Sequence, residues 1–312
     1  MLDQAEAAEP VVGARLLLQM AAHFWRIGRT AEFVECFERS YRLDPHSKIK
    51  QLLPPGARPD QLLQVTQVLM DQGCLYSAVI AIHARAAAAM GRPEAVGRLV
   101  DYSRFYRQGV CDPPAGSTPA AFNATLAEEI KSDLTFYAEH ERSIRNTWRN
   151  DRIMRSAAPG LTALRTILAR EVERYIEGLP KDADHPFIAA RPIDYELDGW
   201  AVVSTAEGYH QAHIHPGAWA TGVYYVSQPQ VSQDPVDPRG WLRVGPPPEL
   251  ADKDTGWETR LVEPKAGSFI LMPAYFYHAP EPMGVDQERI CIAFEVRSPD
   301  LRARARALSR AR

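Results

Sequence analysis

The sequence has little of what marks a disulfide-rich, membrane-bound or nucleic-acid-binding protein. Only 4 cysteines occur in 312 residues, and none forms a Cys-x-x-Cys pair, so we predict isolated reduced thiols. The net charge is only -3 at pH 7, which provides no electrostatic basis for binding nucleic acid. No apolar run approaches the ~18 residues of a membrane span, and the acidic N-terminal residues lack the basic region of a secretory signal. We therefore expect a cytoplasmic protein with neither a nucleic-acid nor a membrane partner.

What is present is the composition of an ordinary globular protein. Hydrophobic residues make up 46% and charged residues 24% of the chain, as in most soluble domains. A chain of 312 residues has room for roughly two domains of about 150 residues each. Composition therefore leaves the chemistry open, and the patterns along the chain have to indicate it.

The first third of the chain has the spacing of paired amphipathic helices. On either side of Gly28, apolar residues recur at helical intervals, at Leu17, Met20, Ala21, Phe24, Phe33, Phe37 and Tyr41. Gly28 suits the end of a helix because glycine tolerates a positive φ. Pro45 predicts the end of the second helix, because proline disfavours α geometry at the residue before it.

This stretch resembles a tetratricopeptide repeat. The matching small, turn, aromatic and closing positions are Ala21, Gly28, Phe37, Ser40 and Pro45. Phe33 stands where the family has a small residue, and a weaker second copy begins near Asp60, with Gly73 at its turn and Ala78 at its small position. Two copies are fewer than the ~3 that a self-supporting stack needs. We therefore predict a helical tetratricopeptide-like domain over residues 1–112 that leans on the rest of the chain.

Two interpretations of this helical domain remain open at this stage. It can be a docking surface for a peptide, a carrier protein or a second subunit, which leaves a homodimer open. It can equally be plain helical packing that stabilises the rest of the molecule.

The middle of the chain predicts supporting helices over residues 113–185. A segment with three prolines and a glycine, residues 111–120, is typical of a linker. We expect a helix in the segment that starts at Phe122, with Asn123 or Thr125 as its cap. A second helix is predicted from about Gly160 to Gly178, since its apolar residues recur at helical spacing.

The pattern becomes strand-like from about Phe187. Short segments rich in β-branched and aromatic residues alternate with Gly and Pro, namely YELDGWAVVST, TGVYYVSQ, GWLRVG, TRLVEP, GSFILMP and RICIAFEV. Residues 229–248 contain six prolines and are predicted to form a loop that serves as a lid or specificity element. We predict an antiparallel sandwich or barrel over residues 186–298, followed by an arginine-rich, solvated tail at 299–312.

Histidines are concentrated where these strands could carry a site. His213 and His215 are two residues apart, so on a strand they point to the same face, and His278 is the only histidine further downstream. Such a set is typical of an open metal site, in which three ligands leave positions for substrate and oxygen. Arg289 opens a mostly apolar strand and there needs a counter-anion.

Together these features resemble the jelly-roll core of the iron(II)/2-oxoglutarate-dependent oxygenases. More narrowly, they are similar to a bacterial and phage subfamily with an H-x-H-P-G motif. The resemblance spans about residues 187–297 and rests on an ordered set of matches, which are His213 to Gly217, Thr221 to Val226, Pro264, Gly267, Met272, Pro273, His278, Pro282 and Arg289 to Phe294. It implies an α+β multidomain chain in which a helical repeat-like domain precedes a double-stranded β-helix with supporting helices.

The resemblance also implies the metal ligands. His213 is expected to be the first iron ligand and His278 the last. Most members of the superfamily have an acidic residue two places after the first histidine, whereas this chain has His215. Either the site is an all-histidine triad, or His215 lies beside the site and an acid comes from elsewhere. A neutral third ligand leaves the iron site one unit more positive.

The cosubstrate site follows from the same resemblance. Arg289 is expected to bind the distal carboxylate of 2-oxoglutarate through a charge-assisted fork. Tyr225 is expected to donate a hydrogen bond to that carboxylate, with Tyr224 as the alternative by strand phase. Tyr209, Gln211 and Trp219 either shape the pocket or pack at a strand end, and His140, His185 and His210 are interpreted as structural.

The implied activity is that of an Fe(II)/2-oxoglutarate-dependent dioxygenase that uses O2. We expect it to hydroxylate a peptide, a carrier-bound or a free amino-acid-like small molecule, with release of succinate and CO2. Two alternatives come from other classes: a three-histidine cupin-type dioxygenase that needs no 2-oxoglutarate, and a non-catalytic helical-repeat interaction protein. His215 argues against a halogenase, which usually has a small residue at that position.

Overall fold

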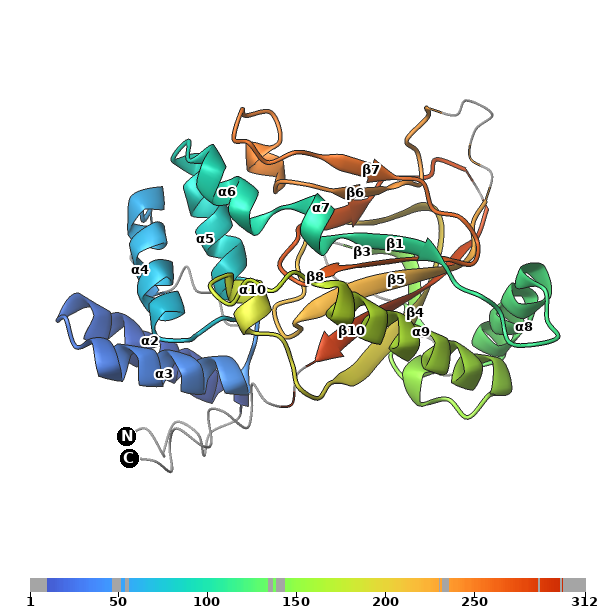
Figure 1. Cartoon of the computed structure of the whole chain (residues 1–312), viewed down its shortest axis with the longest axis horizontal. Helices are drawn as coiled ribbons and strands as arrows, with labels where there is room; N and C mark the ends of the chain where they lie inside the picture. Colours follow the sequence, from blue (N-terminus) through green and yellow to red (C-terminus); the bar gives the residue numbers. More distant parts are fainter. Residues whose placement is uncertain are drawn as a thin grey trace.

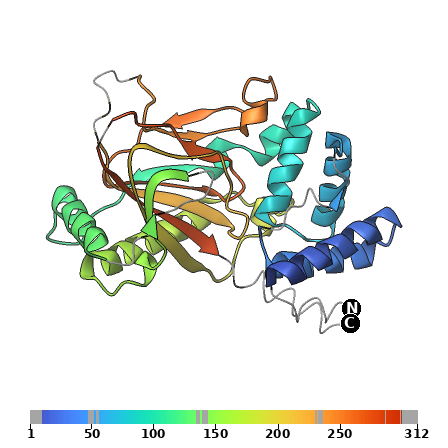
Figure 2. The ribbon, with the colours of Figure 1, turned by 180° about the vertical axis from the view of Figure 1, so that it is seen from behind.

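The structure is a computed structural model in which the helices of residues 10–99 lie at one end of the molecule, and antiparallel strands with further helices packed against them form the rest (Figures 1 and 2). It describes residues 10–46, 52–53, 56–133, 137–138, 144–229, 231, 236–285, 287–297 and 299. His140, the C-terminal tail beyond Pro299 and the side chains of Tyr209 and His210 lie outside the described part. No helix among the described residues is long and apolar enough to cross a membrane.

The helices form two groups along the chain. The N-terminal group is α2 Pro10–Arg26, α3 Thr30–Leu43, α4 Pro59–Asp71, α5 Ser77–Ala89, α6 Pro93–Leu99 and the single turn α7 Tyr102–Phe105. The second group is α8 Pro119–Ser132, the 3-10 turn η2 Ile153–Arg155, α9 Pro159–Gly178 and the single turn α10 Pro186–Ala189, with a later 3-10 turn, η3 Pro248–Leu250.

The paired helices of the N-terminal third are as predicted. Helix α2 packs against α3, and α4 packs against α5. Gly28 and Gly73 occupy the turns with positive φ angles of 74° and 84°, and α3 ends at Leu43, just before Asp44 and Pro45. Glycine is needed at both turns because a side chain at such φ values is strained.

The helical pairs bury two apolar surfaces. One is a core of their own, in which Phe33 and Phe37 of α3 meet Val65 and Leu69 of α4. The other is the opposite face of α5, including Ile80, whose buried side chains join the main core of the molecule. The repeat-like helices therefore pack against the main core of the molecule. Two repeats need this support because they cannot bury all their apolar surface alone.

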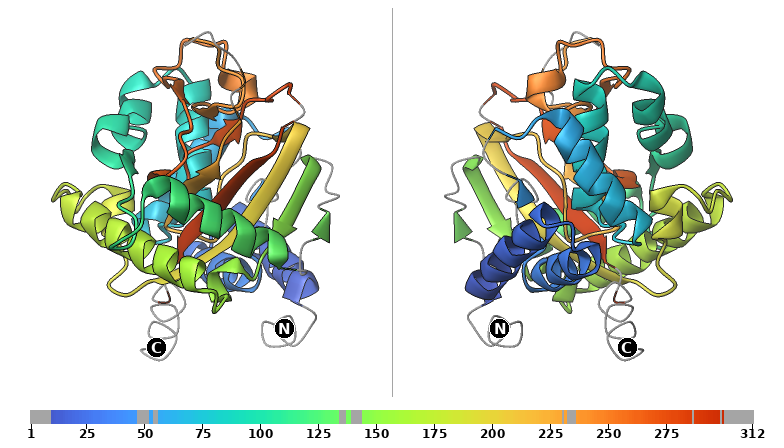
Figure 3. Two further views of the ribbon diagram at one scale, coloured as in Figure 1. Left: turned by 90° about the vertical axis from the view of Figure 1, so that its right-hand side faces the viewer. Right: turned by 90° about the vertical axis from the view of Figure 1, so that its left-hand side faces the viewer.

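The strands form two antiparallel sheets, which Figure 3 shows from the side. The larger has the order β1-β8-β5-β10-β4-β3-β2 and the smaller has the order β7-β6-β9. Their bounds are β1 Arg107–Val110, β2 Tyr137–Ala138, β3 Ile144–Asn150, β4 Glu196–His210, β5 Ala220–Ser227, β6 Leu242–Val244, β7 Arg260–Val262, β8 Ser268–Pro273, β9 His278–Pro280 and β10 Arg289–Arg297. The mixed helix and antiparallel-sheet architecture agrees with the prediction.

Among the differences from the sequence-based prediction, two concern segments that precede β4. Arg107–Val110, placed in the helical domain, is an edge strand that pairs with β8. The helix expected from Phe122 begins at Pro119, is capped by Thr118, whose Oγ1 accepts a hydrogen bond from the Ala121 backbone N–H at 3.2 Å, and stops at Ser132. Further along, Tyr137–Ala138 and Ile144–Asn150 form β2 and β3 instead of helix, because β3 pairs with β4 and that long-range pairing overrides local helical spacing.

Helix α9 covers the outer face of the larger sheet (Figure 1). Its apolar stripe, including Leu164, Leu168 and Val172, is buried in the main core. On β10, the residues that alternate with the pocket-facing ones belong to the same core. The helix thus seals one face of the sheet and leaves the other face for a site.

His185 makes the stability of this core depend on pH. The ring is fully buried: it donates through Nε2 to the Arg98 carbonyl at 3.1 Å and accepts at Nδ1 from the Phe187 N–H at 3.2 Å, so it must stay neutral. Burial lowers its pKa from 6.5 to about 4. Because the unfolded chain binds the proton more readily, the free energy of unfolding should fall, by up to about 3 kcal/mol, as the pH drops from about 6.5 towards 4.

Urea unfolding at a series of pH values checks this prediction. His185→Asn can still accept a hydrogen bond at the helix cap but does not titrate, so its stability should change less over this range. Equal slopes for the two proteins would show that His185 is not responsible.

Candidate metal centre

The side chains of β10 alternate between a cavity and the main core. Arg289, Cys291 and Glu295 line a cavity of about 690 Å³, whereas Ile290 and Phe294 are buried in the main core. This division follows from the two-residue period of a strand, which sends alternate side chains to opposite faces.

The loop between β4 and β5 carries two of the three histidines. We expected His213 and His215 to lie on a strand, but β4 ends at His210 and the loop is joined to the sheet by single contacts. His213 and His278 exchange two backbone hydrogen bonds of 3.1 Å, and the His215 N–H donates to the Ala274 carbonyl at 2.9 Å. These hydrogen bonds tie the loop backbone to His278 and Ala274, although the loop does not form a regular strand.

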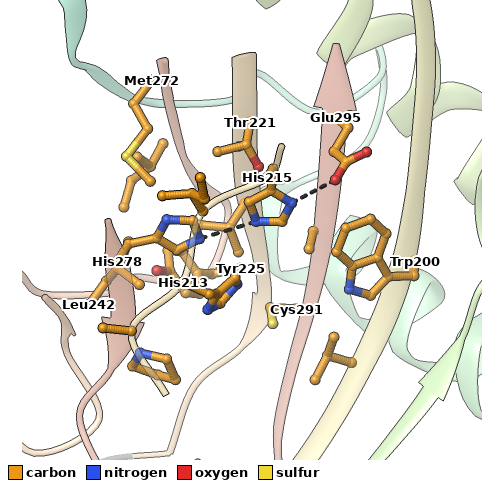
Figure 4. Close-up of a pocket in the computed structure, with 18 of the residues that line it drawn as sticks. Trp200, His213, His215, Thr221, Tyr225, Leu242, Met272, His278, Cys291 and Glu295 are labelled. Atoms are coloured by element: carbon orange, nitrogen blue, oxygen red, sulfur yellow. Dashed lines mark hydrogen bonds and ion pairs between the residues drawn. The ribbon is translucent and has the colours of Figure 1, made fainter. Parts of the chain in front are cut away.

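His213, His215 and His278 converge on one point of the cavity (Figure 4). Each offers a ring nitrogen, and these three atoms lie within 4.8 Å of one another. The Nε2 atoms of His215 and His278 are 3.2 Å apart. Two nitrogens that each bind one metal ion at ~2.1 Å lie about this far apart.

The second nitrogen of each ring has a hydrogen-bond partner. Nδ1 of His213 is 2.8 Å from the Gln211 carbonyl, and Nδ1 of His278 is 3.0 Å from the Phe276 carbonyl. A carbonyl only accepts, so Nδ1 must donate in both rings and Nε2 then carries the lone pair. Such outer hydrogen bonds are what orient histidines that bind metals.

His215 is held by a carboxylate instead of a carbonyl. Its Nδ1 lies 2.6 Å from Oε1 of Glu295, and both side chains are only 8% exposed. The Trp200 ring stacks beside the imidazole with centroids 5.7 Å apart. Burial by itself raises the pKa of Glu295, but the hydrogen bonds and charges of His215 and Arg297 lower it to about 2, so this carboxylate is ionised.

The cluster therefore fits a divalent transition metal with three nitrogen ligands. Among the described residues, no Asp or Glu joins the three histidines, and Glu295 lies behind His215, not beside the metal position. Three imidazoles leave further coordination positions open to the cavity.

Arg289 lies in the same cavity with little to neutralise it. The side chain is 4% exposed. Its Nε donates to Ser204 Oγ at 3.3 Å and its Nη1 reaches the Gly240 carbonyl at 3.5 Å. Among the residues that the structure describes, no carboxylate forms an ion pair with Arg289. A buried guanidinium needs an anionic partner, and the open cavity beside Arg289 is a place where an anionic ligand could supply it.

The two candidate tyrosines point in opposite directions. Tyr225 lines the cavity, and burial raises the pKa of its hydroxyl, which keeps the group protonated as a donor. Tyr224 lies outside the cavity: its hydroxyl donates to Oδ1 of Asn123 at 2.6 Å on the other face of the sheet. Tyr224 is therefore not placed to donate to a carboxylate bound in the cavity, because neighbouring residues of β5 point to opposite faces of the sheet.

Of the other residues near the motif, Trp219 is part of the core. Its Nε1 donates to the Phe187 carbonyl at 3.0 Å, and the two rings stack with centroids 4.5 Å apart. Gln211 lines the cavity and its carbonyl orients His213.

The N-terminal helices contact the loop that carries the histidines. The Tyr41 hydroxyl of α3 donates to the Pro216 carbonyl, and Ser77 Oγ of α5 donates to the Ala218 carbonyl at 2.6 Å. His46, just after α3, lines the cavity. Sequence reasoning missed these contacts, which carry no local signal.

Sequence reasoning also missed Glu295, although a signal for it existed. An acid in the apolar strand RICIAFEV, six residues after Arg289 and hence on the same face, is unusual enough to suggest a role.

A family comparison identifies the class of this domain. Residues 198–295 match the family model described as "Putative 2OG-Fe(II) oxygenase". This segment contains His213, His215 and His278 of the cluster together with Arg289 and Tyr225. The chain thus carries a 2-oxoglutarate/Fe(II) oxygenase domain, which is an oxidoreductase with iron as cofactor and 2-oxoglutarate as cosubstrate. No curated protein matches the chain significantly.

Several solved structures are similar to this one at low sequence identity. A prolyl-4-hydroxylase of Pseudomonas putida is 16% identical, with a TM-score of 0.44 over 64% of this chain and 97% of that chain. A prolyl hydroxylase of Trichoplax adhaerens, solved with a hypoxia inducible factor peptide, is 14% identical, with a TM-score of 0.45 over 69% and 94%. HygX of Streptomyces hygroscopicus, solved with nickel and 2-oxoglutarate, is 12% identical, with a TM-score of 0.38 over 65% and 86%. The class of the domain rests on the match over residues 198–295.

Proposed function

We propose that this oxygenase is a hydroxylase that binds Fe(II) through His213, His215 and His278 and binds 2-oxoglutarate through Arg289 and Tyr225. The observation that carries the proposal is the convergence of three histidine nitrogens within 4.8 Å of one another, in a cavity that also holds a buried arginine with no carboxylate partner among the described residues. A metal site and an anion site in one cavity are what a 2-oxo acid cosubstrate needs, because it has a chelating end and a distal carboxylate.

Iron, when bound with 2-oxoglutarate and O2, supplies the oxidation of an unactivated C–H bond, coupled to decarboxylation of the cosubstrate to succinate and CO2. Around it, the chain's own side chains have three tasks. The fork of Arg289 binds the distal carboxylate, and the Tyr225 hydroxyl donates to the same group. Apolar side chains that line the cavity exclude water from it. They are Val202, Val223, Leu242, Ile270 and Met272.

The substrate is proposed to be a peptide, a carrier-bound or a free amino-acid-like small molecule. The cavity of about 690 Å³ is within the range of whole ligand sites, and a five-carbon cosubstrate fills only part of it. His46, Arg149 and Trp200 line the same cavity, so the substrate would meet both the strands and the end of the helical pair. A cytoplasmic location and a homodimer stay predictions.

Anaerobic spectroscopy tests the proposed function. Adding Fe(II) and then 2-oxoglutarate to the protein should produce the weak visible charge-transfer band of the chelate. Later admission of O2 should then yield succinate. Bound iron without a band would favour the three-histidine dioxygenase that needs no 2-oxoglutarate. A folded protein that binds no iron would favour the non-catalytic interaction protein.

A further inference from the structure

The three candidate ligands differ in what lies behind them. His213 and His278 each face a neutral backbone carbonyl, whereas His215 faces the carboxylate of Glu295 at 2.6 Å. His215 also occupies the position where most oxygenases of this class have an acidic ligand. The negative charge that an acidic ligand would carry is therefore present in this chain on Glu295, which is separated from the metal position by the His215 ring.

The carboxylate of Glu295 is part of a short chain of charges. Its Oε2 accepts from Nε of Arg297 at 2.8 Å, and Arg297 also pairs with Asp198 at 2.6 Å. Because one arginine is shared by two carboxylates, the three residues together keep a net charge of about −1. Among the described residues, the His215 imidazole is the other group to which the Glu295 carboxylate is hydrogen-bonded.

The backbone keeps this arrangement rigid. In the larger sheet Glu295 of β10 lies directly between Thr221 of β5 and Asp198 of β4. The carboxylate is 8% exposed, so water screens it little. Trp200 stacks on the same imidazole. The ring of His215 thus has one orientation, in which Nδ1 faces the anion and Nε2 faces the cavity.

We propose that Glu295 is a positioning residue that supplies the negative charge of the missing acidic ligand through His215. This inference rests on the proposed function, since it assigns a role toward the proposed metal. An anion bonded to Nδ1–H raises the basicity of the imidazole, so Nε2 becomes a stronger donor, and such outer partners typically change metal affinity by about 10–100-fold. The histidine keeps the geometry of a nitrogen ligand while the site keeps much of its negative charge.

Glu295→Gln tests the role of the charge at constant shape, because the amide oxygen can still accept from Nδ1. We expect Fe(II) affinity, measured anaerobically by competition with a chelator, to fall by about 10–100-fold. The charge-transfer band with 2-oxoglutarate should move to shorter wavelength, because a less electron-rich metal gives up its electron less readily. Glu281→Gln is the matched control: it removes an equivalent charge, from a carboxylate paired with Arg243 at 2.5 Å, without a histidine contact.

Arg297→Gln is expected to shift the charge-transfer band in the direction opposite to that of Glu295→Gln. It also provides a test if Glu295→Gln does not fold. The side chain of Arg297 is 44% exposed, and its removal leaves the charge of Glu295 to His215 alone. The band should then move to longer wavelength, with Fe(II) bound at least as tightly as in the wild type. Circular dichroism confirms the fold of each variant.

The outcomes separate this inference from the proposed function. Wild-type protein that forms no band with Fe(II) and 2-oxoglutarate would contradict the proposed function itself. A wild-type band that stays at the same wavelength in the folded variants, or that shifts as far in Glu281→Gln as in Glu295→Gln, would overturn the role of Glu295 and leave the proposed function intact.

Discussion

Arg289→Ala is expected to weaken the binding of 2-oxoglutarate strongly while leaving Fe(II) bound. The guanidinium is 4% exposed and has no described carboxylate partner, so the cosubstrate carboxylate would be its main anion. Truncating one partner of a buried, hydrogen-bonded charge pair costs about 2–5 kcal/mol. That cost corresponds to a loss of roughly 30-fold to several thousand-fold in affinity.

Anaerobic titration with 2-oxoglutarate, followed through the charge-transfer band, measures this effect. Arg289→Lys keeps the charge but loses the two-pronged geometry of the fork, so its affinity should lie between those of the wild type and Arg289→Ala. Arg243→Ala removes an arginine of the smaller sheet that already pairs with Glu281, and should leave the titration unchanged. An Arg289→Ala protein that binds 2-oxoglutarate as the wild type does would refute the assignment of the carboxylate site.

The second large effect concerns the metal. Alanine at His213 or at His278 is expected to prevent stoichiometric binding of Fe(II). The loss should exceed the about 10–100-fold that follows removal of an outer partner, because a ligand itself is gone. Metal content after anaerobic loading and desalting measures the loss. His23→Ala, at an exposed position of α2, is the control for removal of a histidine.

His215 decides between the two arrangements that the sequence leaves open. If all three histidines are ligands, His215→Ala should lose iron as the other two variants do. His215→Asp, which restores the acidic residue usual in the superfamily, should retain it. If an acid from elsewhere were the third ligand, His215→Ala would keep its iron, and the all-histidine site would be wrong.

Much of the fold could be predicted because local patterns agreed with it. The helical spacing from Gly160 to Gly178 matches α9, which spans Pro159–Gly178. The alternating apolar segment at Arg289 matches β10, which spans Arg289–Arg297. Where local and long-range preferences disagreed, the prediction failed: β3 follows α8 because its backbone pairs with β4, and no local spacing shows such a pairing.

The chemical groups of the site and their order along the chain could be read from the sequence alone. The spacing of His213 and His215, the lone downstream His278 and the arginine that opens an apolar strand were all visible in it. They sufficed to predict a metal site, and the resemblance of the wider motif set to a known family predicted the oxygenase domain, which the match over residues 198–295 supports.

The surroundings of those groups, in contrast, depend on tertiary packing. The partner of His215 is 80 residues away in sequence, and the Tyr41 hydroxyl that holds the Pro216 carbonyl is 175 residues from it. Tyr225 and not Tyr224 faces the cavity because the pairing of β5 within the sheet sets which side each residue takes. The physical reason is the same in each case: spacing along a chain specifies side chains within one element, whereas hydrogen bonds between elements depend on how the whole chain packs.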